Sequence, residues 1–215
     1  MNEYERWQDR FSGQHYAFGK EPNYFLKSCK QLLPRSGRAL AVADGEGRNG
    51  VWLAEQGLDV LSIDFSPLAQ AKARALAIEM RVSVNFEIAD VHRWNYPEAE
   101  FDVVVEIFTQ FSSPNERRAK WTGMRQTLKP GGLLILQGYM PKQIEYATGG
   151  PKQIQNLYTR EIRTRDWRGD VTSRNVCSDR IDGAQTKASR ALADTTTTHV
   201  QCSPSVHRPR STSAP

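Results

Sequence analysis

A glycine-rich segment with two acids follows the first apolar run of the chain. Residues 44–50 read DGEGRNG and match the pattern Gly-x-Gly-x-x-Gly from Gly45 to Gly50. Glycines at this spacing let the backbone turn tightly from a strand into a helix and approach a ligand closely. The helix that follows would present its positive N-terminal end to that ligand. The pattern alone fits an ordinary glycine-rich turn as well as a nucleotide site.

Two further acids stand where an adenosine-type ligand needs hydrogen-bond acceptors. Asp64 ends the second apolar run, 19 residues after Gly45, and a carboxylate there can accept from both ribose hydroxyls. It could instead cap the next helix, but Ser66 already has the residue type and position of that cap. Ala89-Asp90 follows the third run, where an Asp can accept from the adenine amino group or simply end a strand. The glycines and Asp64 together favour an adenosine-containing ligand.

A parallel sheet is the element that would bring these side chains together. Short apolar runs predict strands at 38–43, 59–63, 82–88, 101–107 and 133–137, and helical stretches predict helices at 4–10, 24–33, 49–56, 67–80 and 114–128. Ser66-Pro67 and Ser113-Pro114 each combine an N-cap with proline at the first helical position. Near-continuous apolar strands that alternate with helices predict a doubly wound, mostly parallel α/β sheet covered on both faces.

The positive charge of the chain lies almost wholly in its last quarter. The net charge is +5; residues 1–162 hold 20 Lys and Arg against 19 Asp and Glu, and residues 163–215 hold 9 against 5. The last segment also has 15 Ser and Thr in 53 residues and no helix or strand period. Such a segment buries too little apolar surface to offset the entropy of ordering, so we expect disorder there.

The composition excludes several other classes of protein. No apolar run reaches the roughly 20 residues of a membrane helix, and the first ten residues resemble neither a signal peptide nor a transit peptide. The three cysteines form no CxxC pair and the four histidines are scattered, so we expect no disulfide framework and no metal site. These features favour a cytoplasmic protein that binds neither membrane nor metal.

Taken in order, the motifs resemble the class I S-adenosylmethionine-dependent methyltransferases. The resemblance covers residues 3–162 and rests on the segments 44–50, 64–65, 89–90 and LKPGGL at 128–133. Trp7, Arg10-Phe11, Tyr16, Gly19, the run PNYFL at 22–26 and GGPK at 149–152 are similar to the tellurite-resistance-type branch. The resemblance implies a Rossmann-like methyltransferase domain at 1–162, with lid helices at 1–36 and a core at 37–162, and S-adenosylmethionine as cofactor.

The resemblance also assigns roles to individual residues. It places Gly45 and Gly47 beside the methionine part of the cofactor and Asp64 beside the ribose. Phe65 would lie beside the adenine, and Asp90, with Ala89, beside the adenine amine. Ile107 would lie near the donor methyl. Ala41 and Ala43 stand where many members have an acid and the first glycine, so Asp44 is our candidate acceptor for the cofactor's ammonium. Arg10 is a candidate partner for its carboxylate, or else a surface arginine on an amphipathic helix.

Methyl transfer from a sulfonium is an in-line displacement that mainly needs positioning and exclusion of water. Positioning can contribute about 7–11 kcal/mol, and a thiolate or a chalcogen oxyanion needs no obligatory general base. We therefore expect a small-molecule acceptor and assign no catalytic residue. The candidate pocket walls are Tyr16, Phe108, Phe111 and Tyr139, for which core or lid packing is the other interpretation.

Two other functions fit part of the pattern. A nicotinamide-dependent oxidoreductase would explain the glycines and Asp64, but neither Asp90 nor the LKPGG turn nor the N-terminal lid. A nucleic-acid methyltransferase would use the basic tail, but its eight arginines are dispersed without interleaved aromatic residues, whereas a nucleic-acid footprint is a focused patch. We expect no nucleic-acid partner, and the sequence specifies no oligomeric state.

The resemblance stops near residue 162, where the family continues with two more strands. We therefore expect the C-terminal strands to be missing or replaced, and residues 163–215 to be an out-of-frame or otherwise replaced C-terminus. We also expect 133–137 to form an open apolar edge. Losing two strands would consume much of a stability margin of about 5–15 kcal/mol, so an impaired cofactor-binding relic is the alternative function. A strand-rich continuation in another reading frame of the DNA would support this origin of the tail.

Overall fold

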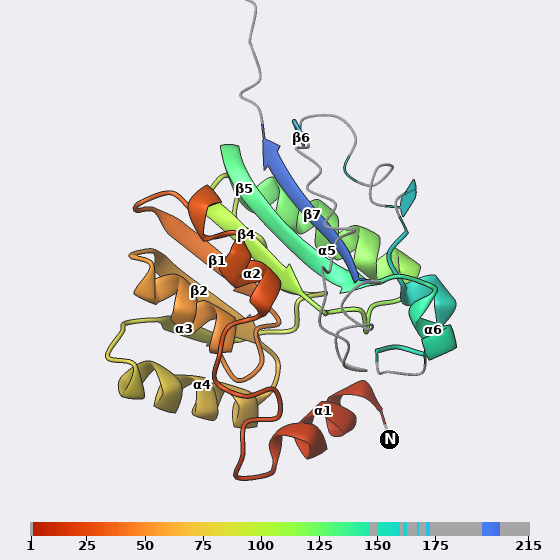
Figure 1. Cartoon of the computed structure of the whole chain (residues 1–215), viewed down its shortest axis with the longest axis horizontal. Coiled ribbons are helices and arrows are strands. Elements are labelled where there is room, and N and C mark those ends of the chain that lie inside the picture. Colours follow the sequence, from red (N-terminus) through yellow and green to blue (C-terminus); the bar gives the residue numbers. More distant parts are fainter. Residues whose placement is uncertain are drawn as a thin grey trace, which may run out of the picture.

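Apolar residues that alternate in direction along the strands give the chain one sheet with two buried faces. The structure is a computed structural model and describes residues 2–146, 150–159, 161–162, 167, 171–172 and 195–202. Within these residues the sheet has seven strands in the order β3-β2-β1-β4-β5-β7-β6, with helices on both sides (Figure 1). The predicted doubly wound α/β fold is confirmed.

The elements follow the predicted order. The strands are β1 (Arg38–Val42), β2 (Asp59–Asp64), β3 (Asn85–Ile88), β4 (Phe101–Ile107), β5 (Leu128–Tyr139), β6 (Val171–Thr172) and β7 (Thr195–Cys202). The α-helices are α1 (Glu3–Phe11), α2 (Tyr24–Ser28), α3 (Arg48–Glu55), α4 (Pro67–Glu79), α5 (Pro114–Thr127) and α6 (Gln143–Tyr146). Two 3₁₀ turns, η1 (Lys30–Leu32) and η2 (Ile154–Asn156), complete the described elements.

The first five strands run parallel and reverse their order at β1. β1 pairs with β2 on one side and with β4 on the other, while β3 extends the β2 side and β5 the β4 side. Ligands of such sheets bind beyond the carboxyl ends of the strands, at the point where the order reverses. The candidate site therefore lies between the ends of β1 and β4.

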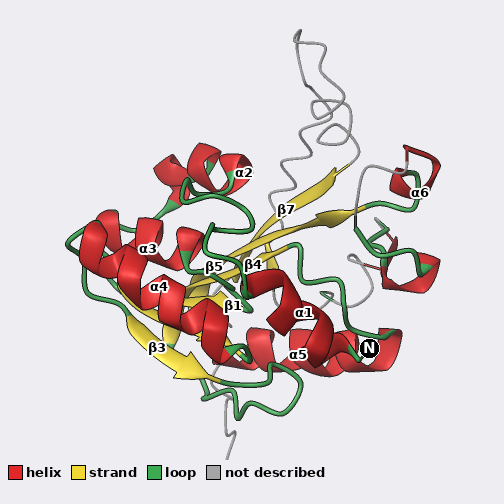
Figure 2. Cartoon of the chain, turned by 90° about the horizontal axis from the view of Figure 1, so that it is seen from below, coloured by secondary structure: helices red, strands yellow, loops and turns green. Residues whose placement is uncertain are grey.

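Side chains from the central strands alternate between two cores. Leu40, Val104 and Leu134 point to the core under α5, which includes Trp121 and Met124. Their strand neighbours, including Ala39, Val103 and Leu133, point to the core under α2 and α3. Figure 2 shows α3 and α4 on one side of the sheet and α5 on the other. The period of two along each strand thus produces the two buried faces.

Serine and asparagine caps set the helix starts. Ser66 and Ser113 accept from the backbone N–H of Ala69 and Glu116 and precede proline at the first helical position, as predicted. The boundaries differ elsewhere: the predicted helix at 24–33 divides into α2 and η1, and β3 begins only at Asn85. Residues of the LKPGG segment belong to β5, where the register shifts and Gly131 has φ 79°.

The open edge expected at 133–137 is the main correction to the sequence analysis. In the segment where we expected the family's strands to be missing or replaced, β7 pairs antiparallel with β5, with Thr195 opposite Tyr139 and Gln201 opposite Leu133. β5 is therefore not an open edge along this register. The run of β-branched threonines favours a strand, and pairing with β5 satisfies backbone groups that a count of apolar side chains ignores. The expected disorder of 163–215 otherwise falls outside the described residues.

No helix in the part of the chain that the structure describes is long and apolar enough to span a membrane.

Candidate functional site

Backbone hydrogen bonds join the carboxyl ends of β1, β2 and β3. Asp44 N donates to Ile63 O at 3.1 Å, and Ala89 N donates to Asp64 O at 3.0 Å. Gly45 N donates to the carboxylate of Asp64 at 2.9 Å. The predicted site residues on these three strand ends therefore form one continuous rim.

The glycine turn has the conformation that only glycine adopts without cost. Gly45 has φ 61° and Gly47 has φ 84°, both in the left-handed region. Gly47 is the N-cap of α3 and lies against α4, because a Cβ built on it would be 2.6 Å from the Cβ of Ala73. The turn is therefore fixed both by its own backbone and by close contact with a neighbouring helix.

Substituting Gly47 with alanine is expected to lower the free energy of unfolding by about 2–3 kcal/mol, from left-handed strain and overpacking against α4. Urea unfolding at pH 7 measures the loss. Gly13→Ala is the matched control, because a Cβ at Gly13 meets nothing within 4 Å. Equal unfolding midpoints for Gly47→Ala and the wild type would contradict the contact with Ala73.

Two carboxylates at this rim have pKa values above the ordinary range of an aspartate. Burial raises the pKa of Asp44 to about 7, although Gly50 N and Ser62 Oγ donate to it. Burial also raises the pKa of Asp64 to about 6 against donation from Ser66 N and Gly45 N. Asp64 is 3% exposed and Asp44 is half-buried. A cationic group placed beside them would be attracted strongly, because their charge is poorly solvated.

The end of β4 forms the opposite wall. Phe108 has φ 57° and its N–H donates to Gln137 O at 2.8 Å. The rings of Phe108 and Tyr139 lie 4.5 Å apart, so two of the four predicted pocket walls lie together. Gln110 accepts from Tyr139 N and donates to Tyr139 O at 2.5 and 2.9 Å, which fixes the ends of β4 and β5 to each other.

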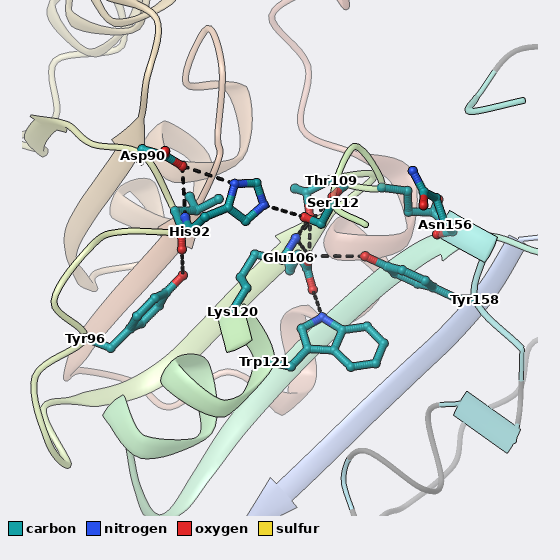
Figure 3. A network of polar contacts seen from close by, with 12 residues as sticks. Asp90, His92, Tyr96, Glu106, Thr109, Ser112, Lys120, Trp121, Asn156 and Tyr158 are labelled. Carbon is teal, nitrogen blue, oxygen red and sulfur yellow. Dashed lines mark hydrogen bonds and ion pairs between the residues drawn. The ribbon is translucent and has the colours of Figure 1, made fainter. Parts of the chain in front are cut away.

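A buried ion pair supports this wall from below (Figure 3). Lys120 Nζ on α5 lies 2.5 Å from Glu106 Oε1 on β4, and both side chains are fully buried. Trp121 Nε1 and Tyr158 OH donate to the same carboxylate at 2.7 and 3.2 Å. Lys120 also donates to the carbonyl of Thr109. Burial lowers the pKa of Lys120, and the carboxylate beside it offsets part of that effect.

Helix α1 lies over the rim from the other side. The Tyr4 and Phe65 ring centroids are 5.5 Å apart, and Ser66 Oγ donates to Gln8 at 2.9 Å. Phe11 is 4% exposed and is the nearest side chain to a Cβ built on Gly45. The predicted lid therefore contacts both the glycine turn and the predicted adenine wall.

The structure does not bring every predicted residue into the site. The guanidinium of Arg10 lies over the exposed ring of Phe18, 5.2 Å from its centroid. Tyr16 donates to the carbonyl of Lys72 at 3.0 Å and so contacts α4 rather than Phe108 or Tyr139. Phe111 packs edge-on against the imidazole of His92, with centroids 5.6 Å apart.

Sequence analysis missed a buried acid within the glycine turn. Glu46 is 4% exposed; it lies 2.7 Å from Lys72 Nζ and accepts from Ala17 N at 2.6 Å. It thus joins the segment after α1 to α4 and holds the lid connection in place. An acid between two glycines in a turn could have indicated a buried charge. Its partners Ala17 and Lys72 lie far away in the sequence, so the pattern did not reveal them.

The donor set at the rim fits S-adenosylmethionine. The left-handed glycines add no side chain of their own to the turn, Asp44 and Asp64 provide acceptors of raised pKa, and the Phe65 ring is half-buried. Asp90 is exposed just beyond β3. Acceptors, an aromatic face and a glycine backbone are what a cationic amino-acid nucleoside requires.

The strand order and this rim define a Rossmann-like domain of the methyltransferase type. Residues 39–132 match the family model of the methyltransferase domain. Over these residues the chain is similar to the S-adenosylmethionine-dependent methyltransferases, and S-adenosylmethionine is the cofactor that this similarity indicates.

The relatives agree on the chemistry and differ in the acceptor. The chain is 33% identical over 132 residues to a demethylmenaquinone methyltransferase from Deinococcus radiodurans, covering 60% of this chain and 52% of the relative. It spans about half or less of the first curated relatives that it matches.

Two solved structures share the fold at low sequence identity. The N-methyltransferase NodS from Bradyrhizobium japonicum, in complex with S-adenosylhomocysteine, has a TM-score of 0.67 at 15% identity over 94% of this chain and 99% of that chain. A TehB-like S-adenosylmethionine-dependent methyltransferase from Corynebacterium glutamicum has a TM-score of 0.61 at 17% identity, covering 92% and 95%. At this identity the likeness concerns the fold.

Proposed function

We propose that this protein transfers a methyl group from S-adenosylmethionine to a small-molecule acceptor. The observation that carries the proposal is the rim at the reversal of strand order, where the glycine turn and Asp44 follow β1, Asp64 ends β2, and β4 is the neighbour of β1 on the other side. The methyltransferase family match over residues 39–132 supports the same reaction.

In this proposal each side of the rim has its own task. Asp44 binds the ammonium of the cofactor, Asp64 the ribose, and Asp90, beside Ala89, the adenine amine. Gly45 and Gly47 lie along the methionine part, and Ile107 at the end of β4 is near the donor methyl. Arg10 would have to leave Phe18 to reach the cofactor's carboxylate.

The bound sulfonium supplies both the methyl group and a good leaving group. The chain then has to align the acceptor with it and exclude water, a contribution of about 7–11 kcal/mol in well-oriented reactions. Helix α1 covers the rim, and the paired rings of Phe108 and Tyr139 form an apolar wall opposite. An acceptor that is already anionic, such as a thiolate or a chalcogen oxyanion, needs no base in this arrangement.

Ligand binding tests the proposal directly. S-adenosylhomocysteine at 100 times its dissociation constant is expected to stabilise the full chain by about 2.7 kcal/mol, which is read as a rise in the thermal unfolding midpoint. NADH serves as the control and is expected to leave the midpoint unchanged. Stabilisation by NADH but not by S-adenosylhomocysteine would refute the proposal.

The acceptor is identified by assaying the same protein with labelled S-adenosylmethionine. The panel contains a thiol, selenite, tellurite and small amine and quinol metabolites. Label transfer to a thiol or a chalcogen oxyanion would support the tellurite-resistance-type branch, and transfer only to an amine or a quinol would exclude it.

A further inference from the structure

A histidine connects the loop after β3 with the loop after β4. His92 Nδ1 lies 3.2 Å from Asp90 Oδ1, and its backbone N–H donates to the same oxygen at 2.9 Å. On the other side of the ring, Nε2 lies 2.8 Å from Ser112 Oγ. Figure 3 shows the imidazole between these two partners.

The partners assign the protons on this ring. A carboxylate can only accept, so we assign the ring proton to Nδ1, which faces Asp90 at 3.2 Å, and the acceptor role to Nε2, which faces the hydroxyl of Ser112. Ser112 is 1% exposed and His92 is half-buried. Ser112, His92 and Asp90 therefore form a series of polar contacts, in which Ser112 is hydrogen-bonded to the ring and Asp90 to the His92 backbone N–H.

One consequence concerns which oxygen of Asp90 faces a ligand. Both contacts from His92 engage Oδ1, whereas Oδ2 lies 3.8 Å from the exposed guanidinium of Arg93. His92 therefore holds the carboxylate so that Oδ2 is presented outward. A planar carboxylate fixed through one oxygen accepts from a ligand in one direction, which favours an amine placed in the plane beyond β3.

The other consequence concerns the β4–α5 loop, residues 108–113. Phe111 in this loop lies between the edge of the His92 ring and Lys120, whose Nζ is 5.2 Å from the Phe111 centroid. Lys120 also donates to both oxygens of Thr109 at 3.1 and 2.8 Å. The loop is thus held by the buried ion pair on one side and by His92 on the other.

We propose that His92 is a positioning residue that couples recognition of the adenine amine by Asp90 to the order of the β4–α5 loop. The inference rests on the proposed function, because it takes the adenine of S-adenosylmethionine as the ligand of Asp90. When the amine engages Oδ2, the carboxylate, the imidazole and the Ser112 hydroxyl are locked in one arrangement, and the loop that faces the acceptor is ordered with them.

Two substitutions of His92 test separately its contact with Asp90 and its contact with Ser112. His92→Asn places an amide N–H near the position of Nδ1 but is too short to reach Ser112. His92→Gln reaches toward Ser112 but lacks a donor at the δ position. Calorimetry gives the affinities for S-adenosylhomocysteine and for its analogue S-inosylhomocysteine, in which a carbonyl oxygen replaces the exocyclic amine of the base.

His92→Gln is expected to weaken S-adenosylhomocysteine binding by about tenfold, the effect of losing a well-placed bond to a charged group. Binding of the inosyl analogue is expected to change less than twofold. His92→Asn is expected to retain the affinity for S-adenosylhomocysteine. In the wild type, S-adenosylhomocysteine is expected to slow amide hydrogen exchange at 108–113, and this slowing is expected to disappear in His92→Asn.

The outcomes distinguish this inference from the proposed function. Equal losses for the two ligands in His92→Gln, or unchanged loop protection in His92→Asn, would overturn the coupling and leave the methyltransferase proposal intact. A wild-type chain that binds neither ligand would overturn both. His15→Gln, at an exposed histidine, is the matched control, and circular dichroism establishes that each variant is folded.

Discussion

Replacing Asp44 with asparagine is expected to stabilise the ligand-free protein at pH 8 and to weaken its binding of S-adenosylhomocysteine. Burial raises the pKa of Asp44 to about 7 in the folded chain, whereas an unfolded Asp titrates near 3.9. The folded state therefore holds this proton more firmly than the unfolded state. Wild-type stability falls as the pH rises from about 4 through 7, and this fall is complete above 7.

An asparagine has no charge to desolvate and can still accept from Gly50 N and Ser62 Oγ, the two donors of Asp44. The gain over the wild type is expected to be about 1–3 kcal/mol at pH 8, after a discount for solvent screening of a half-buried group. It is expected to vanish below about pH 4. Urea unfolding at the two pH values measures it, with Glu98→Gln, at an exposed acid, as the control.

The same substitution removes the proposed partner of the cofactor's ammonium. Loss of a charge-assisted bond of about 1.5–3 kcal/mol corresponds to a tenfold to hundredfold weaker affinity. In the wild type a bound cation also lowers the pKa of Asp44, so protons are released on binding at pH 6.5 and the measured enthalpy depends on the buffer. Asp44→Asn with unchanged affinity and unchanged proton release would refute the assignment of Asp44.

Local signals in the sequence predicted the frame of the site. Proline after serine marks the starts of α4 and α5, and an apolar run that ends at a glycine cluster marks the end of β1. Because parallel strands place their carboxyl ends at one edge, Asp44 and Asp64 were expected to lie together. In the structure the backbone N–H of Gly45, the residue after Asp44, donates to the Asp64 carboxylate at 2.9 Å.

Contacts between segments far apart in the sequence were not predicted, because they depend on the tertiary arrangement and not on local patterns. β7 pairs with β5 across more than 50 residues, and its threonines look polar in a count that weighs side chains only. Tyr16 and Arg10 have the residue types of pocket and cofactor partners, yet their contacts with Lys72 and Phe18 depend on how the lid connection lies on α4.

A charged residue in a buried strand was a signal that sequence reasoning did not use. Glu106 interrupts the apolar run of β4, and in α5 the residues at 117, 120, 121 and 124 share the helix face that is buried. Helical periodicity therefore placed Lys120 toward the sheet. Buried charges occur in pairs because an unpaired one costs too much, so the strand acid and the helix base could have been predicted as partners.

Replacing Lys120 with methionine is expected to destabilise the protein by about 3–5 kcal/mol at pH 8, because Glu106 is left as a buried charge without a cation. Both side chains are fully buried in the wild type. Urea unfolding at pH 8 measures the loss.

The double variant Glu106→Gln with Lys120→Met is the decisive control. A glutamine keeps one oxygen that can accept from Trp121 Nε1, and its amide N–H can donate to the Tyr158 hydroxyl, which replaces the bond that Tyr158 donates to Glu106. The methionine fills the volume of the lysine stem. Replacing a buried ion pair by neutral groups of similar volume is often close to neutral, so the double variant is expected to recover most of the stability that Lys120→Met loses. A double-mutant cycle from urea unfolding measures the coupling; additive losses would show that the two side chains do not form a charged pair in the folded protein.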